Sequence, residues 1–427
     1  MRVLRHEPKC NPHAENYGSN RRERTDGVRP LAIDDVGMLE IQGPAQRVDI
    51  DASTAHKVVI AGGGVAALEA LLTLRELAWG RVEIDLLTPS SEFVYRPMEL
   101  AALFRDERVQ RFDLSRIAAD QGANLVRDRL EGVWPGNRVV TQSGAVRPYD
   151  SLLIAVGAHL RIGVPGAITV AAPGFRQEFR RALEDLEDGF AHRLAFAAPA
   201  GTGWLLPLYE LALLTADHLA ARDVAADLII VTSEDAPLEV FGADASEHVA
   251  QLLAERGIEM LASHRPISFG ANGLVTAPSA PVDVDRVVAL PAMRGPNIRG
   301  IPETVTGFIP TDGHGRVLGV DDVYAAGDGT AFPVKQGGLA AQQADAAAAA
   351  IAAAAGAEIE PEPFAPVLRG LLLTGAEPHY LRHDLMRPES GSQTAERSLW
   401  WPPAKVAARS LTPYLAARPG LELRGTT

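Results

Sequence analysis

Several features are scarce in this chain of 427 residues, and each scarcity narrows the class of protein. Its one cysteine, Cys10, cannot form an intrachain disulfide, and no Cys-x-x-Cys pair is present for metal binding or redox relay. We therefore expect a cytoplasmic protein. The opening residues, MRVLRHEPKC, lack the apolar core of a secretory signal.

Long apolar runs and clusters of basic residues are also missing. The most apolar stretch, residues 339–355, contains Gln342, Gln343 and Asp345, so we interpret it as a soluble alanine-rich helix rather than a membrane span. The formal net charge is −13 and no basic run follows residue 30, which argues against nucleic-acid binding. The histidines show no ligand spacing such as HExxH, so we predict no metal site.

Apolar residues make up 47% of the sequence and aromatic residues only 6%, a balance typical of α/β folds with aliphatic interiors. A first alternation of strand, helix and strand is expected at 57–61, 65–77 and 81–87, with a further buried strand at 151–155. A second alternation is expected at 193–198, 205–221, 226–232, 244–256 and 258–263. We therefore predict two tandem Rossmann-like domains. Residues 1–55 are polar and lack periodicity, so we predict a disordered N-terminal extension.

A glycine turn joins the first strand to the first helix. It reads Gly62-x-Gly64-x-x-Ala67. Gly62 permits the tight turn, Gly64 lets a diphosphate approach the backbone, and Ala67 allows the helix to pack closely on the strand. The helix N-terminus adds free N–H groups and a partial positive charge. We predict that Gly62, Gly63, Gly64 and Ala67 bind a dinucleotide. The alternative is a tight turn without a ligand.

The acidic residue that usually binds a ribose hydroxyl about 20 residues further on has no clean counterpart here. The next strand ends at Thr88, and Asp85 lies three residues earlier on that strand. A threonine hydroxyl can donate and accept a hydrogen bond. We therefore assign Thr88 to the ribose of an adenosine.

Later motifs resemble those of FAD-dependent pyridine nucleotide-disulfide oxidoreductases. Ala155-Val156-Gly157 is similar to the motif that closes their FAD domain, and DDVYAAGDGTAF, with Gly327-Asp328, is similar to their second FAD signature. The loop FVYRP and the segment PVKQGGLAAQQADAAAAAIA resemble elements beside and beneath the isoalloxazine in one group of the family. That group comprises sulfide:quinone oxidoreductases, flavocytochrome c sulfide dehydrogenases and type II NADH dehydrogenases. The resemblance covers roughly residues 56–350.

This resemblance implies FAD as the cofactor. The further cofactor-binding residues that it implies are Arg96, Pro97, Ala155, Gly157, Gly327, Asp328, Lys335, Gln336 and Gly337. Asp328 would contact the ribityl chain or its phosphates, although a helix cap or turn former is the alternative. A helix beginning near Gly338 would direct its positive end at the pyrimidine edge of the flavin. Lys335 would add a full charge there as a catalytic residue. The alternative for Lys335 is a solvated loop lysine.

The resemblance also divides the chain. It implies an FAD-binding domain in two parts, residues 56–170 and 283–357, around an NAD(P)-binding-like domain at 171–282. Strands expected at 286–289 and 323–326 would return to the first domain. The sequence EPEP then marks a linker into a C-terminal segment, residues 358–427.

The second Rossmann turn departs from a nicotinamide site. Gly201 and Gly203 are followed by Trp204, two leucines and Pro207, which crowd the backbone approach that a diphosphate needs. Residues 207–210, Pro-x-Tyr-Glu, resemble the sulfide-oxidising branch, which receives sulfur on cysteines beside the flavin. This chain has no cysteine there. The sequence therefore excludes sulfide oxidation by that mechanism and disfavours NADH oxidation.

We therefore predict an FAD-dependent oxidoreductase that passes electrons from an unidentified small-molecule donor to a quinone-like or other acceptor. An NAD(P)H dehydrogenase is one alternative. A flavoprotein that binds FAD for structure or sensing, with little turnover, is the other, and the degenerate second turn favours it.

The C-terminal segment pairs Trp400 and Trp401 with three positive charges, Lys405, Arg409 and Arg418. Aromatic and basic residues in this pattern are typical of a helix on a membrane surface. The resemblance implies a C-terminal segment near a quinone channel, here at the inner face of the membrane. The alternative, which we favour, is that the two tryptophans pack onto the flavin domain or onto the partner in a homodimer. Nearby prolines limit this segment to a short helix.

Overall fold

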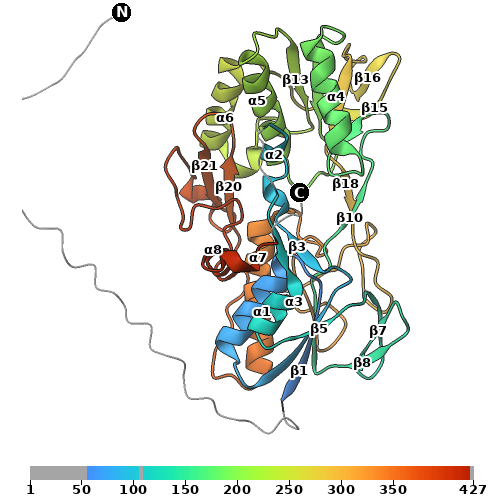
Figure 1. Ribbon diagram of the computed structural model, residues 1–427, viewed down its shortest axis with the longest axis vertical. Coiled ribbons are helices and arrows are strands. Elements are labelled where there is room, and N and C mark those ends of the chain that lie inside the picture. The colour runs from blue at the N-terminus through green and yellow to red at the C-terminus, as the bar shows by residue number, and fades with distance from the viewer. Residues whose placement is uncertain (1–54, 105–108, 424–427) are drawn as a thin grey trace, which may run out of the picture. The chain divides into compact units, whose positions relative to one another are not determined.

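The computed structural model describes residues 55–104 and 109–423 (Figure 1). Apart from Ala55, the N-terminal extension predicted at residues 1–55 lies outside the described residues. Two five-stranded parallel sheets form two Rossmann-like domains, and a small antiparallel sheet follows near the C-terminus. The predicted α/β class and the two tandem domains are confirmed.

The first sheet has the strand order β19-β9-β1-β2-β5. Its strands are Val323–Ala325, Ser151–Ile154, His56–Ala61, Val82–Leu87 and Asn124–Val126, all parallel. Helices α1 (Val65–Leu77), α3 (Leu114–Asp120) and α7 (Gly337–Ala354) pack in one core on one face. A second sheet, made of β6 (Leu130–Trp134), β7 (Arg138–Thr141) and β8 (Val146–Pro148), covers the other face.

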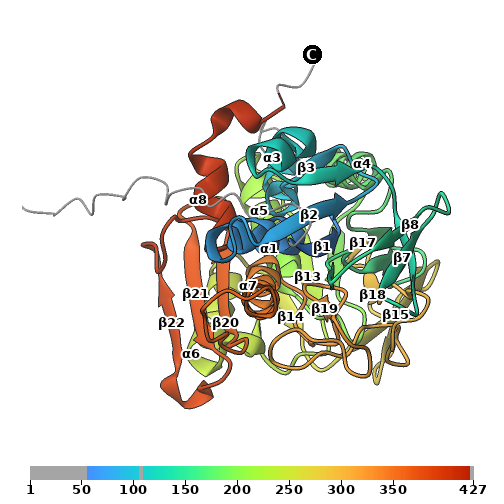
Figure 2. The ribbon, with the colours of Figure 1, turned by 90° about the horizontal axis from the view of Figure 1, so that it is seen from below.

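Helices α1 and α7 lie side by side on the helical face of the first parallel sheet (Figure 2). Close packing of two helices requires small side chains, and α7 is rich in alanine. Ala340, Ala344 and Ala347 are almost fully buried in the core that α7 shares with α1. The alanine-rich stretch that the sequence excluded as a membrane span is therefore a buried helix of the core. Among the described residues, no helix is long and apolar enough to cross a bilayer.

The second parallel sheet has the order β11-β17-β12-β13-β14. Its strands are Ile168–Thr169, Arg286–Ala289, Arg193–Ala197, Asp227–Val231 and Glu259–Leu261. Helices α4 (Phe175–Glu187), α5 (Leu206–Ala220) and α6 (Ala243–Glu255) share one core on one face, and the hairpin of β15 (Arg265–Gly270) and β16 (Gly273–Ala277) packs on the other.

One strand assignment was wrong. Residues 286–289 were expected to return to the first domain, but β17 pairs in parallel with β12 and β11 of the second sheet. The chain then passes through β18 (Ala292–Arg294), which pairs with β10 (His159–Arg161), and rejoins the first sheet at β19. A βαβ alternation establishes that a strand is parallel and buried, but it does not determine which of two sheets receives it.

Short elements and the C-terminal part complete the fold. β3 (Glu92–Val94) pairs with β4 (Arg111–Asp113), and a 3-10 helix (Arg96–Met98) and α2 (Ala101–Phe104) lie between them. β20 (Val367–Leu372), β21 (His379–Asp384) and β22 (Ser392–Ala395) form the antiparallel sheet, which contacts α7 and the second domain. The chain continues into α8 (Leu411–Ala416), a short helix as its prolines predict.

Candidate functional site

The first glycine turn lies between β1 and α1, at the carboxyl ends of three neighbouring strands. Gly62 has a φ of +142°, and a Cβ on it would lie 2.2 Å from the carbonyl oxygen of Ala155. A Cβ on Gly63 would lie 2.8 Å from Oγ1 of Thr88. Ala67 is fully buried in the core beneath the sheet. Packing within the protein therefore explains why Gly62 and Gly63 are glycines.

Gly64 differs from its two neighbours. It is the N-cap of α1, its backbone is extended with φ −97° and ψ −167°, and a Cβ on it would meet nothing within 4 Å. Neither backbone strain nor packing against the rest of the protein requires a glycine here. The first N–H groups of α1 have no partner within the helix and face this open space, which suits an anion. The turn therefore fits a diphosphate that approaches the backbone at Gly64.

Thr88 lies at the end of β2, directly beside the turn. It is 2% exposed, and its hydroxyl accepts a hydrogen bond of 3.3 Å from the N–H of Ser90. Asp85 is engaged elsewhere, in an ion pair of 2.9 Å with Arg147 and a hydrogen bond from Asn124. Thr88 is therefore next to the glycine turn, as the ribose assignment requires, whereas Asp85 is not available for this role.

The two later motifs meet the turn from neighbouring strands. Residues 155–157 follow β9, and the N–H of Ala155 donates to the carbonyl oxygen of Ala61. Gly327 follows β19 with a φ of +84°, and a Cβ on it would lie 3.2 Å from that of Ala66 in α1. A Cβ on Gly329 would lie 3.0 Å from the carbonyl oxygen of Gly157. The fold thus brings three segments to one edge of the first sheet, although the first and the last are about 270 residues apart in the sequence.

Asp328 and Lys335 are two partly buried charges on the loop between β19 and α7. Lys335 is 8% exposed; its Nζ donates to the carbonyl oxygen of Thr330 and lies 3.9 Å from the ring centroid of Phe308. Burial lowers the pKa of Lys335 to about 8, and Asp328 opposes this shift. Burial likewise raises the pKa of Asp328, and Lys335 opposes it. The alternative of a solvated loop lysine is therefore wrong.

The start of α7 is also defined by its side chains. Gln336 is the N-cap, and its side chain accepts from the N–H of Leu339 at 2.8 Å. A Cβ on Gly337 would lie 3.0 Å from Val406. The N–H of Val406 donates to the hydroxyl of Tyr95, the residue before the 3-10 helix that contains Arg96 and Pro97. The N-terminal, positive end of α7 and the predicted flavin-side loop are therefore both next to Val406 of the C-terminal segment.

The second glycine turn is covered by the chain itself at Gly203, although a Cβ on Gly201 would meet no described atom within 4 Å. The N–H of Lys335 donates to the carbonyl oxygen of Gly203 at 3.0 Å. A Cβ on Gly203 would lie 2.4 Å from the carbonyl oxygen of Pro333. Trp204 packs on Phe241 with ring centroids 5.8 Å apart. The loop before α7 therefore occupies the space in front of the backbone that a second diphosphate would approach.

The carboxylate nearest to a ribose-binding position in the second domain is also occupied. Glu234 follows β13, is 6% exposed, and accepts a hydrogen bond of 2.6 Å from the hydroxyl of Tyr209. Burial raises the pKa of Glu234 to about 7. This side chain points into the domain and is satisfied there, so it is not free to bind a sugar hydroxyl.

Sequence reasoning missed one buried ion pair near the start of α7. Glu210, from the Pro-x-Tyr-Glu stretch, is paired with Lys405, and both are less than a tenth exposed. Lys405 was counted with Arg409 and Arg418 among the positive charges of the C-terminal segment, but it is buried and paired with Glu210 of α5. The spacing of Pro207, Tyr209 and Glu210 was a signal, but the partner of Glu210 is 195 residues away.

The two tryptophans of the C-terminal segment have different surroundings. Trp400 packs on Tyr380 with ring centroids 5.0 Å apart, and its Nε1 donates to the carbonyl oxygen of Ala404. Trp401 is 87% exposed. Arg409 forms ion pairs with Glu76 of α1 and Asp345 of α7. The segment therefore packs on the first domain through Arg409 and on β21 of the antiparallel sheet through Trp400.

Comparison with known proteins agrees with this geometry, although no family model matches the chain. A sulfide-quinone reductase from Aquifex aeolicus is 27% identical over 294 residues, which cover 66% of this chain. The chain thus spans 63% of the length of that relative.

Solved structures show the same fold. The sulfide:quinone oxidoreductase of Aquifex aeolicus superposes with a TM-score of 0.73 and 20% identity, covering 80% of this chain and 87% of that one. A ferredoxin reductase from Rhodopseudomonas palustris has a TM-score of 0.58 and 20% identity, covering 77% and 82%. A NAD-dependent persulfide reductase from A. fulgidus has a TM-score of 0.55 and 16% identity, covering 78% and 65%. The chain is a homologue of sulfide-quinone reductase with the two-domain fold of the pyridine nucleotide-disulfide oxidoreductases.

Proposed function

We propose that this protein is an FAD-dependent oxidoreductase that passes electrons to a quinone-like acceptor from a small-molecule donor other than NADH or NADPH. The observation that carries the proposal is the open space at Gly64, beside the free N–H groups of α1. None of the described residues fills this position, and a glycine there is explained by a ligand that touches the backbone. Homology to sulfide-quinone reductase supports the same class of enzyme.

The residues that would hold FAD belong to one edge of the first sheet. Gly62, Gly63, Gly64 and Ala67 would receive the diphosphate, and Thr88 the adenosine ribose. The remaining residues proposed for the site are Arg96, Pro97, Ala155, Gly157, Gly327, Asp328, Lys335, Gln336 and Gly337. When bound, FAD would supply two-electron redox chemistry, with negative charge at its pyrimidine edge in the reduced form.

Lys335 and the N-terminus of α7 would stabilise that charge. Lys335 is held in place by the carbonyl oxygen of Thr330 and the ring of Phe308, so its ammonium is positioned without reorganisation. Gln336 fixes the first turn of α7, which keeps the helix N–H groups directed at the site. The chain thus contributes orientation and electrostatics, and no side chain in the proposed site is arranged as a nucleophile.

The proposals for donor and acceptor rest on different grounds. The acceptor is proposed from the homologous sulfide-quinone reductase, whose name states its acceptor. Sulfide itself is not proposed as donor through redox cysteines, because residues 55–423 contain none. NADH and NADPH are not proposed because Pro333 and Lys335 cover the turn at Gly203.

A second candidate is a flavoprotein that binds FAD for structure or sensing and turns over little. The second turn favours it, since the loop before α7 covers Gly203, where a nicotinamide cofactor's diphosphate would approach. An anaerobic experiment distinguishes the two functions. The flavin is photoreduced and then mixed with a soluble quinone or with oxygen while the visible flavin absorbance is followed. Rapid reoxidation by quinone supports the enzyme, and slow reoxidation by both acceptors supports the sensor. A donor screen with the same readout then identifies the reductant.

A further inference from the structure

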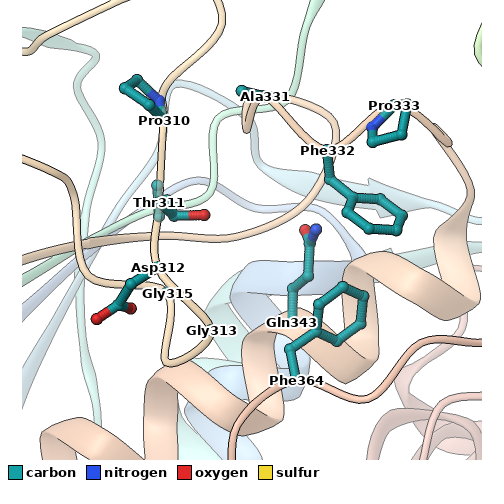
Figure 3. Close-up of a pocket in the computed structure, with 11 residues that line it drawn as sticks. Pro310, Thr311, Asp312, Gly313, Gly315, Ala331, Phe332, Pro333, Gln343 and Phe364 are labelled. Atoms are coloured by element: carbon teal, nitrogen blue, oxygen red, sulfur yellow. The ribbon is translucent and has the colours of Figure 1, made fainter. Parts of the chain in front are cut away.

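A cavity of about 370 Å³ lies beside the loop that joins β19 to α7, at the β19 edge of the first sheet (Figure 3). It is enclosed by the loop around Thr311, by α7, and by two phenylalanines from different segments, Phe332 and Phe364. The two rings meet edge to face with centroids 5.2 Å apart. Its volume is within the range of small-molecule sites, and its walls combine apolar rings with the polar side chains of Thr311, Asp312 and Gln343.

One buried polar group points into this cavity. Gln343 of α7 is 8% exposed, and its Oε1 accepts a hydrogen bond of 2.7 Å from the N–H of Gly327. Because a backbone N–H can only donate, the amide atom that faces Gly327 must be the oxygen. The NH₂ of Gln343 therefore points the other way, between Thr311 and Phe332 (Figure 3). No described residue accepts a hydrogen bond from it.

The charges around the cavity indicate what it would exclude. Asp312 is the only ionisable residue among those that line it. Its Oδ1 accepts hydrogen bonds of 2.8 Å from the N–H groups of His314 and Arg316, and its carboxylate turns away from Gln343 (Figure 3). A charged ligand would lose its hydration and find no free counter-charge here.

We propose that this cavity binds a small, uncharged, planar molecule that presents a hydrogen-bond acceptor to the NH₂ of Gln343 and places its ring against Phe332 and Phe364. The NH₂ of Gln343 is unpaired within the described residues and open to the cavity, so an acceptor on the ligand would take the place of solvent there and add one hydrogen bond. Aromatic rings favour edge-to-face or offset contacts with a planar guest. The cavity adjoins the proposed FAD site, since Gln343 also accepts from the N–H of Gly327, but the proposal does not require FAD to bind there.

The experiment uses three probes of similar shape with the purified full chain, and binding is measured by saturation-transfer NMR. Benzamide carries a ring and a carbonyl acceptor, toluene carries the ring alone, and benzamidine carries a positive charge. We expect benzamide to bind at least about tenfold more tightly than toluene, the value of one hydrogen bond, and benzamidine to bind no better than toluene. Equal binding of benzamide and toluene, or tighter binding of benzamidine, would overturn the proposal.

Two variants locate the binding. Gln343→Glu keeps an oxygen for the N–H of Gly327 but replaces the donor with an acceptor, so at pH above 8 it should weaken benzamide about tenfold and favour benzamidine. Ala331→Phe, at an exposed residue of the cavity wall, fills the space without removing a core contact and should abolish benzamide binding. Unchanged benzamide affinity in Ala331→Phe would show that the probe binds elsewhere, even if Gln343→Glu misfolds.

Discussion

Replacing Gly64 with leucine tests whether its missing side chain serves a ligand or the fold. The backbone at Gly64 is extended and a Cβ meets no atom within 4 Å, so leucine is accommodated by the protein. The cost to folding is that of a weaker N-cap, about 1 kcal/mol. The side chain would occupy the space in front of α1, where a diphosphate would accept about two charge-assisted hydrogen bonds of about 1.5–3 kcal/mol each. Losing both weakens FAD binding by about 10²- to 10⁴-fold.

The assay is the flavin content of purified protein and titration of apoprotein with FAD, followed by flavin fluorescence. Gly270→Leu is the matched control, because a Cβ on Gly270 also meets nothing within 4 Å but the residue lies at the end of β15 in the second domain. Gly62→Ala provides the opposite case, since its Cβ would lie 2.2 Å from a carbonyl oxygen and the protein should fail to fold. If Gly64→Leu folds and keeps the FAD affinity of Gly270→Leu, the assignment of the turn is refuted.

Three further outcomes follow from the buried charges and the covered turn. Lys335→Met should lower the flavin midpoint potential, measured by potentiometry, by about 20–60 mV, equivalent to about 1–3 kcal/mol. This difference should shrink as the pH rises above about 8, where the wild-type lysine becomes neutral. Lys57→Met, which replaces an exposed lysine, is the control. Lys405→Met leaves Glu210 buried without its cation and should cost about 3–5 kcal/mol in urea unfolding, whereas adding Glu210→Gln should recover most of it; no recovery would show that the pair is not coupled. NADH and NADPH should reduce the flavin slowly and without saturation in anaerobic stopped flow, because the chain covers Gly203; fast bleaching at micromolar NADH would contradict this.

The parts of the fold that depend on local spacing were predictable from the sequence. The glycine turn was expected at Gly62 and the helix after it at residues 65–77, where α1 lies. Both could be predicted because glycine spacing and apolar periodicity are encoded within a few residues. The assignment of β17 failed, since strand polarity does not specify a sheet. The pairing of Lys405 with Glu210 spans 195 residues, and no local pattern marks a lysine as buried.

The candidate site shows the same division. The sequence motifs identified the three segments that meet at the edge of the first sheet, and the resemblance assigned them to FAD. The obstruction at Gly203 was predicted from the bulk of Trp204, but the structure shows a different cause, because the carbonyl oxygen of Pro333 fills the space. Contacts of this kind arise from loops that approach each other only in the folded chain.

The most direct test of the central claim is the identity and stoichiometry of the bound flavin. The full chain is purified, its visible spectrum is recorded, and the flavin released by denaturation is identified by chromatography against FAD and FMN standards. We expect FAD, at one per chain after reconstitution, because the open glycine turn and the adjacent Thr88 suit a diphosphate and an adenosine ribose, and FMN has no adenosine. Protein that remains colourless with excess FAD, or that binds FMN alone, would contradict the account.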